Sequence, residues 1–224
     1  NVKFVRDMSV RLGMSHEAGA GLLKTFNAMG VSSTENARLQ AEAAEKLALQ
    51  NGLAPKQVLE DMAKASGETA GYFRGNVQNL MKAAVFARKT GIEMSTMASQ
   101  ADKLLDFESS IAAEMEASVL LGRQLNFDKA RQLALEGDLA GASQAVLDQV
   151  GGLDQFNKLN VVQKKALAAA AGLELTQLQD QLVAAEKRSN MSAEEIKAME
   201  KQAQKQQSVK TEFDKLKGTM EAAM

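Results

Sequence analysis

Few side chains in this 224-residue chain have the chemistry of a catalytic site, and each has a simpler interpretation. His16 is the single histidine, and it stands beside Glu17 at the expected start of a helix. The sequence has no cysteine, which excludes a thiolate nucleophile, a disulfide and a cysteine-ligated metal. Di-iron bundles and His-Glu-x-x-His zinc sites need at least two histidines. We therefore predict no catalytic residue, no cofactor and no metal ligand, and interpret His16 as a surface residue.

Three pairs of neighbouring carboxylates are a second candidate for a site. Such pairs can perform acid–base chemistry or bind a cation. They stand in stretches rich in Ala, Ser and Lys, which favours a solvated helix face. The pairs are Glu42 with Glu45, Glu114 with Glu116, and Glu194 with Glu195.

Glycine-rich stretches are the third candidate. Residues 19–21 and 151–152 lack the Lys-Ser/Thr pair and the preceding strand of a phosphate-binding loop. We interpret the first stretch as a point of close helix packing and the second as a loop. Tyr72 and Phe73, between two glycines, could contact a partner, but burial of Phe73 in a core is the favoured interpretation.

Residues 166–182 have the spacing of a DNA-binding helix-turn-helix. A small residue, Ala168, is followed four positions later by Gly172, and apolar residues follow the glycine. The second helix, Leu175 to Leu182, contains no Arg or Lys. A helix-turn-helix DNA-binding protein is therefore an alternative and not the favoured interpretation.

The elements that hold these residues are predicted to be helices throughout. Hydrophobic residues make up 45 % of the chain, yet aromatic residues only 4 %, and there is one proline. At several positions a glycine is followed by a large apolar residue, which is typical of a helix end. The fold class we predict is all-α, an array of short helices joined by glycine turns. These glycines are Gly13, Gly30, Gly52, Gly91 and Gly172.

One longer helix is predicted within this array. Residues 95–121 have apolar side chains at steps of three or four, and we expect the first four of them, Leu104, Phe107, Ile111 and Met115, in the core. After Gly122 the predicted helices are short again. They cover residues 127–135, 139–150, 153–159, 161–171 and 175–185.

The chain divides by composition into a multi-helix body, residues 1–189, and a long polar C-terminal helix, residues 190–224. Lys, Gln and Glu dominate the second part, with a thin apolar seam like that of a coiled coil. A helix of this kind needs a partner, so we expect a homo-oligomer. The predicted partner interface is Ile196, Met199, Val209, Phe213, Leu216 and Met220.

Three short sequence segments resemble the helical repeats of tail tape measure proteins from tailed bacteriophages. They are residues 126–139, 156–160 and 163–168, and the turns within residues 13–47 are similar in style. We extend the resemblance over about residues 7–182. It implies a virion structural protein that occupies the tail lumen or tip and sets tail length. It also implies a trimer and contacts with tail tube, hub or baseplate proteins.

Charge and hydropathy bear on the remaining function classes. The formal net charge of -1 gives no attraction to nucleic acid or anionic lipid, so we predict no sequence-specific nucleic-acid partner. No stretch approaches the roughly 20 apolar residues of a membrane span, and we expect no membrane in the assembled state. The start at Asn1 favours a segment of a longer chain. A tail-associated cell-wall hydrolase is the weakest alternative, since one histidine and no strand pattern support it poorly.

Overall fold

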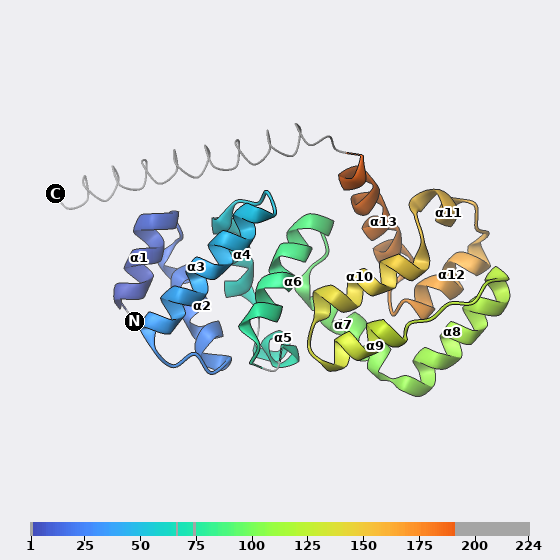
Figure 1. The fold of residues 1–224 in the computed structure, drawn as a ribbon, viewed down its shortest axis with the longest axis horizontal. Helices are drawn as coiled ribbons and strands as arrows, with labels where there is room; N and C mark the ends of the chain where they lie inside the picture. Colours follow the sequence, from blue (N-terminus) through green and yellow to red (C-terminus); the bar gives the residue numbers. More distant parts are fainter. Residues whose placement is uncertain (1, 66, 74, 191–224) are drawn as a thin grey trace. The chain divides into compact units, whose positions relative to one another are not determined.

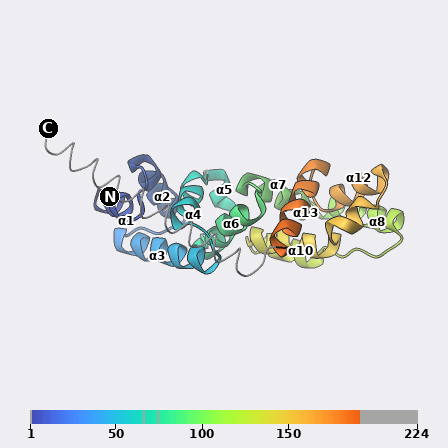
Figure 2. The same ribbon diagram turned by 90° about the horizontal axis from the view of Figure 1, so that it is seen from above.

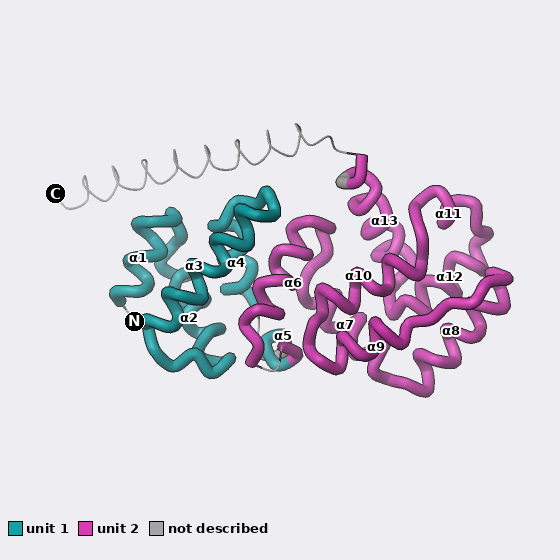
Figure 3. Tube along the Cα trace, in the orientation of Figure 1, with its two compact units in different colours: residues 1–71, 191–224 teal, residues 72–190 magenta. Residues whose placement is uncertain are grey.

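The computed structural model describes residues 2–65, 67–73 and 75–190, and it confirms the predicted all-α class. Thirteen helices and no strand occur in this part of the chain (Figure 1). The described residues divide into two compact units, residues 1–71 and 72–190 (Figure 3). The composition of residues 1–189 gives no sign of this division.

The first unit begins its helices where the sequence pattern expects them. Ser15 and Ser33 each accept a hydrogen bond from the backbone N–H three residues later, which is N-capping. Pro55 occupies the first helical position, where its missing N–H is harmless. The helices are α1 (Val2–Leu12), α2 (His16–Ala28), α3 (Thr34–Gln50) and α4 (Pro55–Lys64), and α5 (Gly67–Tyr72) spans the division between the units.

Close packing at the two α2 glycines is confirmed. A Cβ atom at Gly19 would lie 3.3 Å from Cγ1 of Val5, and one at Gly21 would lie 3.2 Å from the carbonyl oxygen of Ala63. Both distances are shorter than ordinary van der Waals contact. The glycines therefore let α2 approach α1 on one side and α4 on the other.

An ion-pair network joins α1 to α3, which corrects the solvated face predicted for Glu42 and Glu45. Arg11 of α1 lies 2.7 Å from Oε1 of Glu45 and 3.3 Å from Oε1 of Glu42. The Glu45 side chain is only 18 % exposed because α1 packs over this part of α3. Burial raises the pKa of the Glu45 carboxyl, and the Arg11 guanidinium opposes that rise.

The second unit holds eight helices, several of which end at a glycine. Gly91 and Gly122 have φ of +72° and +65° and terminate α6 and α8, a conformation that glycine adopts without a Cβ clash. The helix α10 has the predicted bounds. The eight are α6 (Val77–Thr90), α7 (Met94–Leu105), α8 (Phe107–Leu121), α9 (Asp128–Leu135), α10 (Leu139–Val150), α11 (Leu153–Asn157), α12 (Val161–Ala170) and α13 (Leu175–Ser189).

The single long helix predicted over residues 95–121 is wrong, because Asp106 divides it. Asp106 ends α7 with a non-helical ψ of 82°, and its carboxylate accepts hydrogen bonds from the backbone N–H and the hydroxyl of Ser109. Leu104, before the break, is fully buried as predicted. Beyond the break α8 takes a new direction and turns another face inward. The predicted burial of Phe107, Ile111 and Met115 is therefore wrong, since all three are exposed.

A buried polar side chain ties three elements of the second unit together. Gln100 of α7 is 1 % exposed, and its amide nitrogen donates to the carbonyl oxygen of Ala171 at the end of α12. Its amide oxygen accepts a 2.6 Å hydrogen bond from the hydroxyl of Ser143 in α10. Because both ends of this amide are paired, it fixes α7 against α10 and α12 without an unsatisfied group.

Gln181 of α13 is buried like Gln100 but lacks such hydrogen bonds, and its replacement should stabilise the protein. The side chain is fully buried, and neither amide atom has a hydrogen-bond partner among the described residues. Because an unpaired buried amide is unfavourable, we expect Gln181→Leu to raise the free energy of unfolding by about 1 kcal/mol. Urea unfolding of this variant and of Gln179→Leu, an exposed control on the same helix, measures the effect. A loss of stability in Gln181→Leu relative to that control would contradict the expectation.

Candidate functional site

Helix α8 exposes four large apolar side chains to solvent, and the two side chains that it buries are small. Its buried residues are Ser110 and Ala117. Four apolar residues at steps of four are exposed beside this buried side, and we call them the α8 stripe. They are Phe107, Ile111, Met115 and Val119, with exposed fractions of 49 %, 44 %, 65 % and 81 %. This is the reverse of the ordinary surface helix, whose apolar side faces the core.

A buried arginine fixes the orientation of α8. Arg131 of α9 is 4 % exposed and donates to the hydroxyl of Ser110 at 3.0 Å and to Oε2 of Glu114 at 2.7 Å. Glu114 also accepts a hydrogen bond from the backbone N–H of Phe127. Glu114 is thus part of the packed side of α8, which corrects the solvated face predicted for it. With this side held inward, the α8 stripe must point outward.

The last turn of α8 is held by two further contacts. The hydroxyl of Ser118 accepts a hydrogen bond from the backbone N–H of Leu125, and the amide of Gln163 donates to the carbonyl oxygen of Leu120. The second contact brings the start of α12 beside the end of α8, and both helices lie at the periphery of the second unit in Figures 1 and 2. Val161 and Val162, 64 % and 62 % exposed, extend the apolar surface there.

The charges on α8 have a single sign. Its charged residues are Glu108, Glu114 and Glu116. Arg131 pairs with Glu114, whereas Glu108 and Glu116 are exposed. The α8 stripe therefore carries a carboxylate rim, which would attract a partner with a basic rim.

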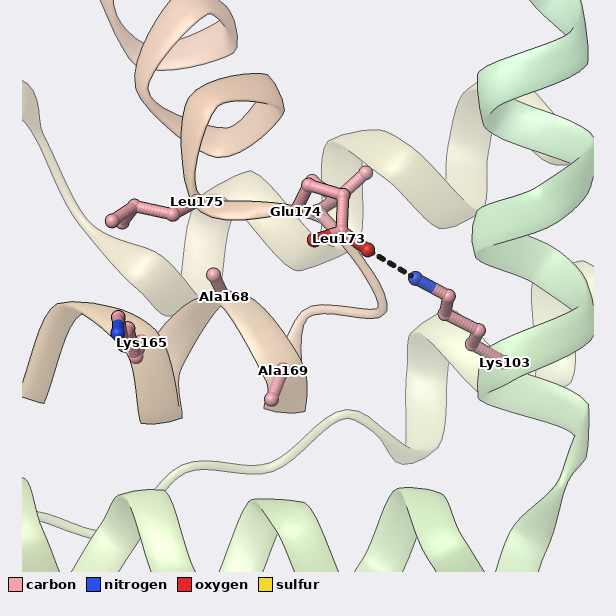
Figure 4. A pocket seen from close by; sticks show the side chains of 7 residues that line it. All are labelled: Lys103, Lys165, Ala168, Ala169, Leu173, Glu174 and Leu175. Atoms are coloured by element: carbon pink, nitrogen blue, oxygen red, sulfur yellow. Dashed lines mark hydrogen bonds and ion pairs between the residues drawn. The ribbon is translucent and has the colours of Figure 1, made fainter. Parts of the chain in front are cut away.

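A separate hollow of about 400 Å³ lies where α12 meets α13 (Figure 4). Across it Nζ of Lys103 lies 3.4 Å from Oε1 of Glu174, and in Figure 4 the Lys165 side chain lies apart from this pair. The rest of the lining consists of Ala and Leu side chains. Its polar groups do not converge on one point, as the polar groups of a ligand-binding pocket usually do.

The same region is the predicted helix-turn-helix, and two of its glutamines, Gln177 and Gln181, face the protein. Gly172 has φ of +71° between α12 and α13. Gln177 accepts a hydrogen bond from the backbone N–H of Glu174 at the start of α13, and Gln181 is buried. Asp180 is exposed on this helix, where it would repel a phosphate backbone. Thr176 and Gln179 remain exposed on the same helix, which carries no Arg or Lys as far as Leu182.

The structure places the other sequence candidates as follows. His16 is exposed at the start of α2, and Phe73 is fully buried, as expected. In the described part of the chain, no three His, Cys, Asp or Glu residues are grouped so as to hold a metal ion. None of its helices has the length and hydropathy needed to cross a membrane. The predicted partner seam from Ile196 to Met220, like Glu194 and Glu195, lies outside the described residues.

Comparison of the chain with protein families, curated proteins and solved structures found no match. The α8 stripe with its carboxylate rim is the feature on which a function can be argued. The sequence spacing identified its four members, but the prediction assigned three of them, Phe107, Ile111 and Met115, to the core.

Proposed function

We propose that this chain is a structural protein of a phage virion, a segment of a tail tape measure protein that acts through helix–helix contacts. The observation that carries the proposal is the α8 stripe, an apolar helix face left exposed by the fold. The local resemblance of residues 126–168 to tape measure repeats gives the proposal its particular setting.

The α8 stripe has the energetics of a docking surface. Full burial of a large apolar side chain contributes about 1.5–3 kcal/mol, and the stripe side chains are roughly half exposed or more. A partner that covers all four therefore gains several kcal/mol before the entropic cost of association. Anchors at steps of four on one helix face are the pattern by which amphipathic helices bind grooves and other helices.

The tape measure role follows from the way a helix converts residue number into length. An α-helix rises about 1.5 Å per residue, so a continuous helix can act as a ruler for a growing tube. The described residues form short helices, several of which end at a glycine, so this part of the chain would be a folded segment within a longer helical ruler. Residues 190–224, with their coiled-coil seam, would continue the ruler or join copies into a trimer. The partners would be tail tube, hub or baseplate proteins.

The location of the chain tests this proposal. An antibody against residues 72–190, applied to particles of the virus that encodes the chain and to disrupted tails, should label the tail lumen or tip. The mass of the isolated chain in solution should exceed that of a monomer. A monomer that is absent from purified particles would overturn the proposal.

Substitution in the α8 stripe should impair association and leave folding intact. In Ile111→Glu/Met115→Glu both new carboxylates lie on an exposed face, so the thermal midpoint should stay near that of the native chain. Covering them would bury unpaired charges, so incorporation into tails should fall about tenfold or more. Quantitative mass spectrometry of purified tails measures this. Leu135→Glu, at a similarly exposed position on α9, is the control and should assemble normally.

A further inference from the structure

We infer that the α8 stripe is covered by residues 205–220 of this chain, from the same copy or a neighbouring one. This inference rests on the proposal that α8 binds a helix, and it is independent of the placement in a phage tail. Residues 205–220 lie outside the described residues, so their contribution is argued from their sequence alone.

The apolar pattern of residues 205–220 matches the α8 stripe in number and length. Its apolar residues are spaced by four, three and four, which places them on one face if the segment is helical. They span about 16 Å at 1.5 Å per residue, and the α8 stripe spans about 18 Å by the same figure. These residues are Val209, Phe213, Leu216 and Met220.

The charges favour this segment over a second copy of α8. The exposed carboxylates on the rim of the α8 stripe are Glu108 and Glu116. Pairing two α8 helices would bring four carboxylates to one interface, which is unfavourable. Residues 205–217 carry four lysines against two acidic residues, so their rim is basic and complementary. The lysines are Lys205, Lys210, Lys215 and Lys217.

The intervening chain is long enough for this contact. Helix α13 ends at Ser189 in the unit that contains α8 (Figure 3). Residues 190–204 can span about 50 Å when extended. A folded unit of this size has a radius of gyration of about 14 Å, so the linker is long enough for the segment to reach α8 on its own unit.

Paired cysteines test the contact, because the native chain has no cysteine. Full-length Met115→Cys/Phe213→Cys should form a disulfide at least about fivefold faster under mild oxidation than Leu135→Cys/Phe213→Cys, whose first cysteine is similarly exposed on α9. A crosslink within the monomer band places the segment on its own copy, and one in a dimer band places it on a neighbour. Equal rates in the two variants would overturn the inference.

Hydrogen exchange gives a second readout without cysteines. Backbone amides of residues 209–220 should exchange several-fold faster in Met115→Glu than in the native chain, and Leu135→Glu should leave them unchanged. Unchanged exchange in Met115→Glu would contradict the inference. A chain located in tails that shows neither crosslink nor altered exchange would overturn this inference alone. A crosslinked chain absent from particles would instead overturn the tail proposal.

Discussion

Arg131→Leu is expected to lower the free energy of unfolding of residues 72–190 by about 3–4 kcal/mol, because it removes one partner of a buried ion pair. Burial acts to lower the pKa of Arg131, but hydrogen bonds with Asp128 and Glu114 outweigh it and leave that pKa above its usual value. Without the guanidinium, the Glu114 carboxylate, which is 15 % exposed, loses its cation. Urea unfolding followed by circular dichroism measures the loss. Lys129→Leu, at an exposed position on the same helix, should change stability by less than about 0.5 kcal/mol.

The same variant should show a defined pH dependence. The Arg131 hydrogen bond lowers the pKa of Asp128, so this pair stabilises the fold above the unfolded-state pKa of about 4 and loses that contribution as the pH falls through the lowered value. The stability difference between the native chain and Arg131→Leu should therefore be largest near neutral pH and shrink below about pH 4. A difference that grows on acidification would contradict the role assigned to this pair.

Gly137→Ala is expected to lower the free energy of unfolding by about 3 kcal/mol or more, about as much as Arg131→Leu, because two effects combine. Gly137 has φ of +76°, and a Cβ atom there would lie 2.5 Å from the carbonyl oxygen of Tyr72, a backbone atom that cannot rotate away. Thermal unfolding of the variant measures the total effect.

Two other glycines separate these effects. Gly122 has φ of +65° with open space around the Cβ position, so Gly122→Ala should show the cost of the backbone conformation alone, about 1–2 kcal/mol. Gly152 has φ of -79° and open space, so Gly152→Ala should be nearly neutral. Equal losses of unfolding free energy in Gly137→Ala and Gly122→Ala would show that the close approach of the Tyr72 carbonyl oxygen does not contribute.

Much of the helical order could be predicted because helix ends are decided locally. The caps at Ser15 and Ser33 depend on a side chain and the N–H groups of the next turn, and both are visible in the sequence. The break at Asp106 was open to the same reasoning, since Asp followed by Ser and Glu is N-cap chemistry. The regular apolar spacing across residues 104–119 continues through Asp106, and for that reason the sequence pattern predicted one helix in place of two.

The candidate site could be predicted in composition but not in orientation. The spacing of Phe107, Ile111 and Met115 identifies one helix face, but spacing alone cannot say whether that face meets the core or a partner. The orientation depends on Arg131, which lies 21 residues after Ser110, donates a hydrogen bond to it and holds that side of α8 inward. A buried arginine is uncommon, and the residues next to Arg131 in the sequence do not predict its burial.

Methionine oxidation tests most directly the claim that the α8 stripe is an interface. Met115 is 65 % exposed, whereas every other methionine in the described residues is 8 % exposed or less, so peroxide should distinguish it. In assembled tails, mass spectrometry should find Met115 oxidised as slowly as the buried Met8 and Met81. Oxidation of Met115 at the rate of a free methionine, while Met8 and Met81 stay intact, would contradict the account.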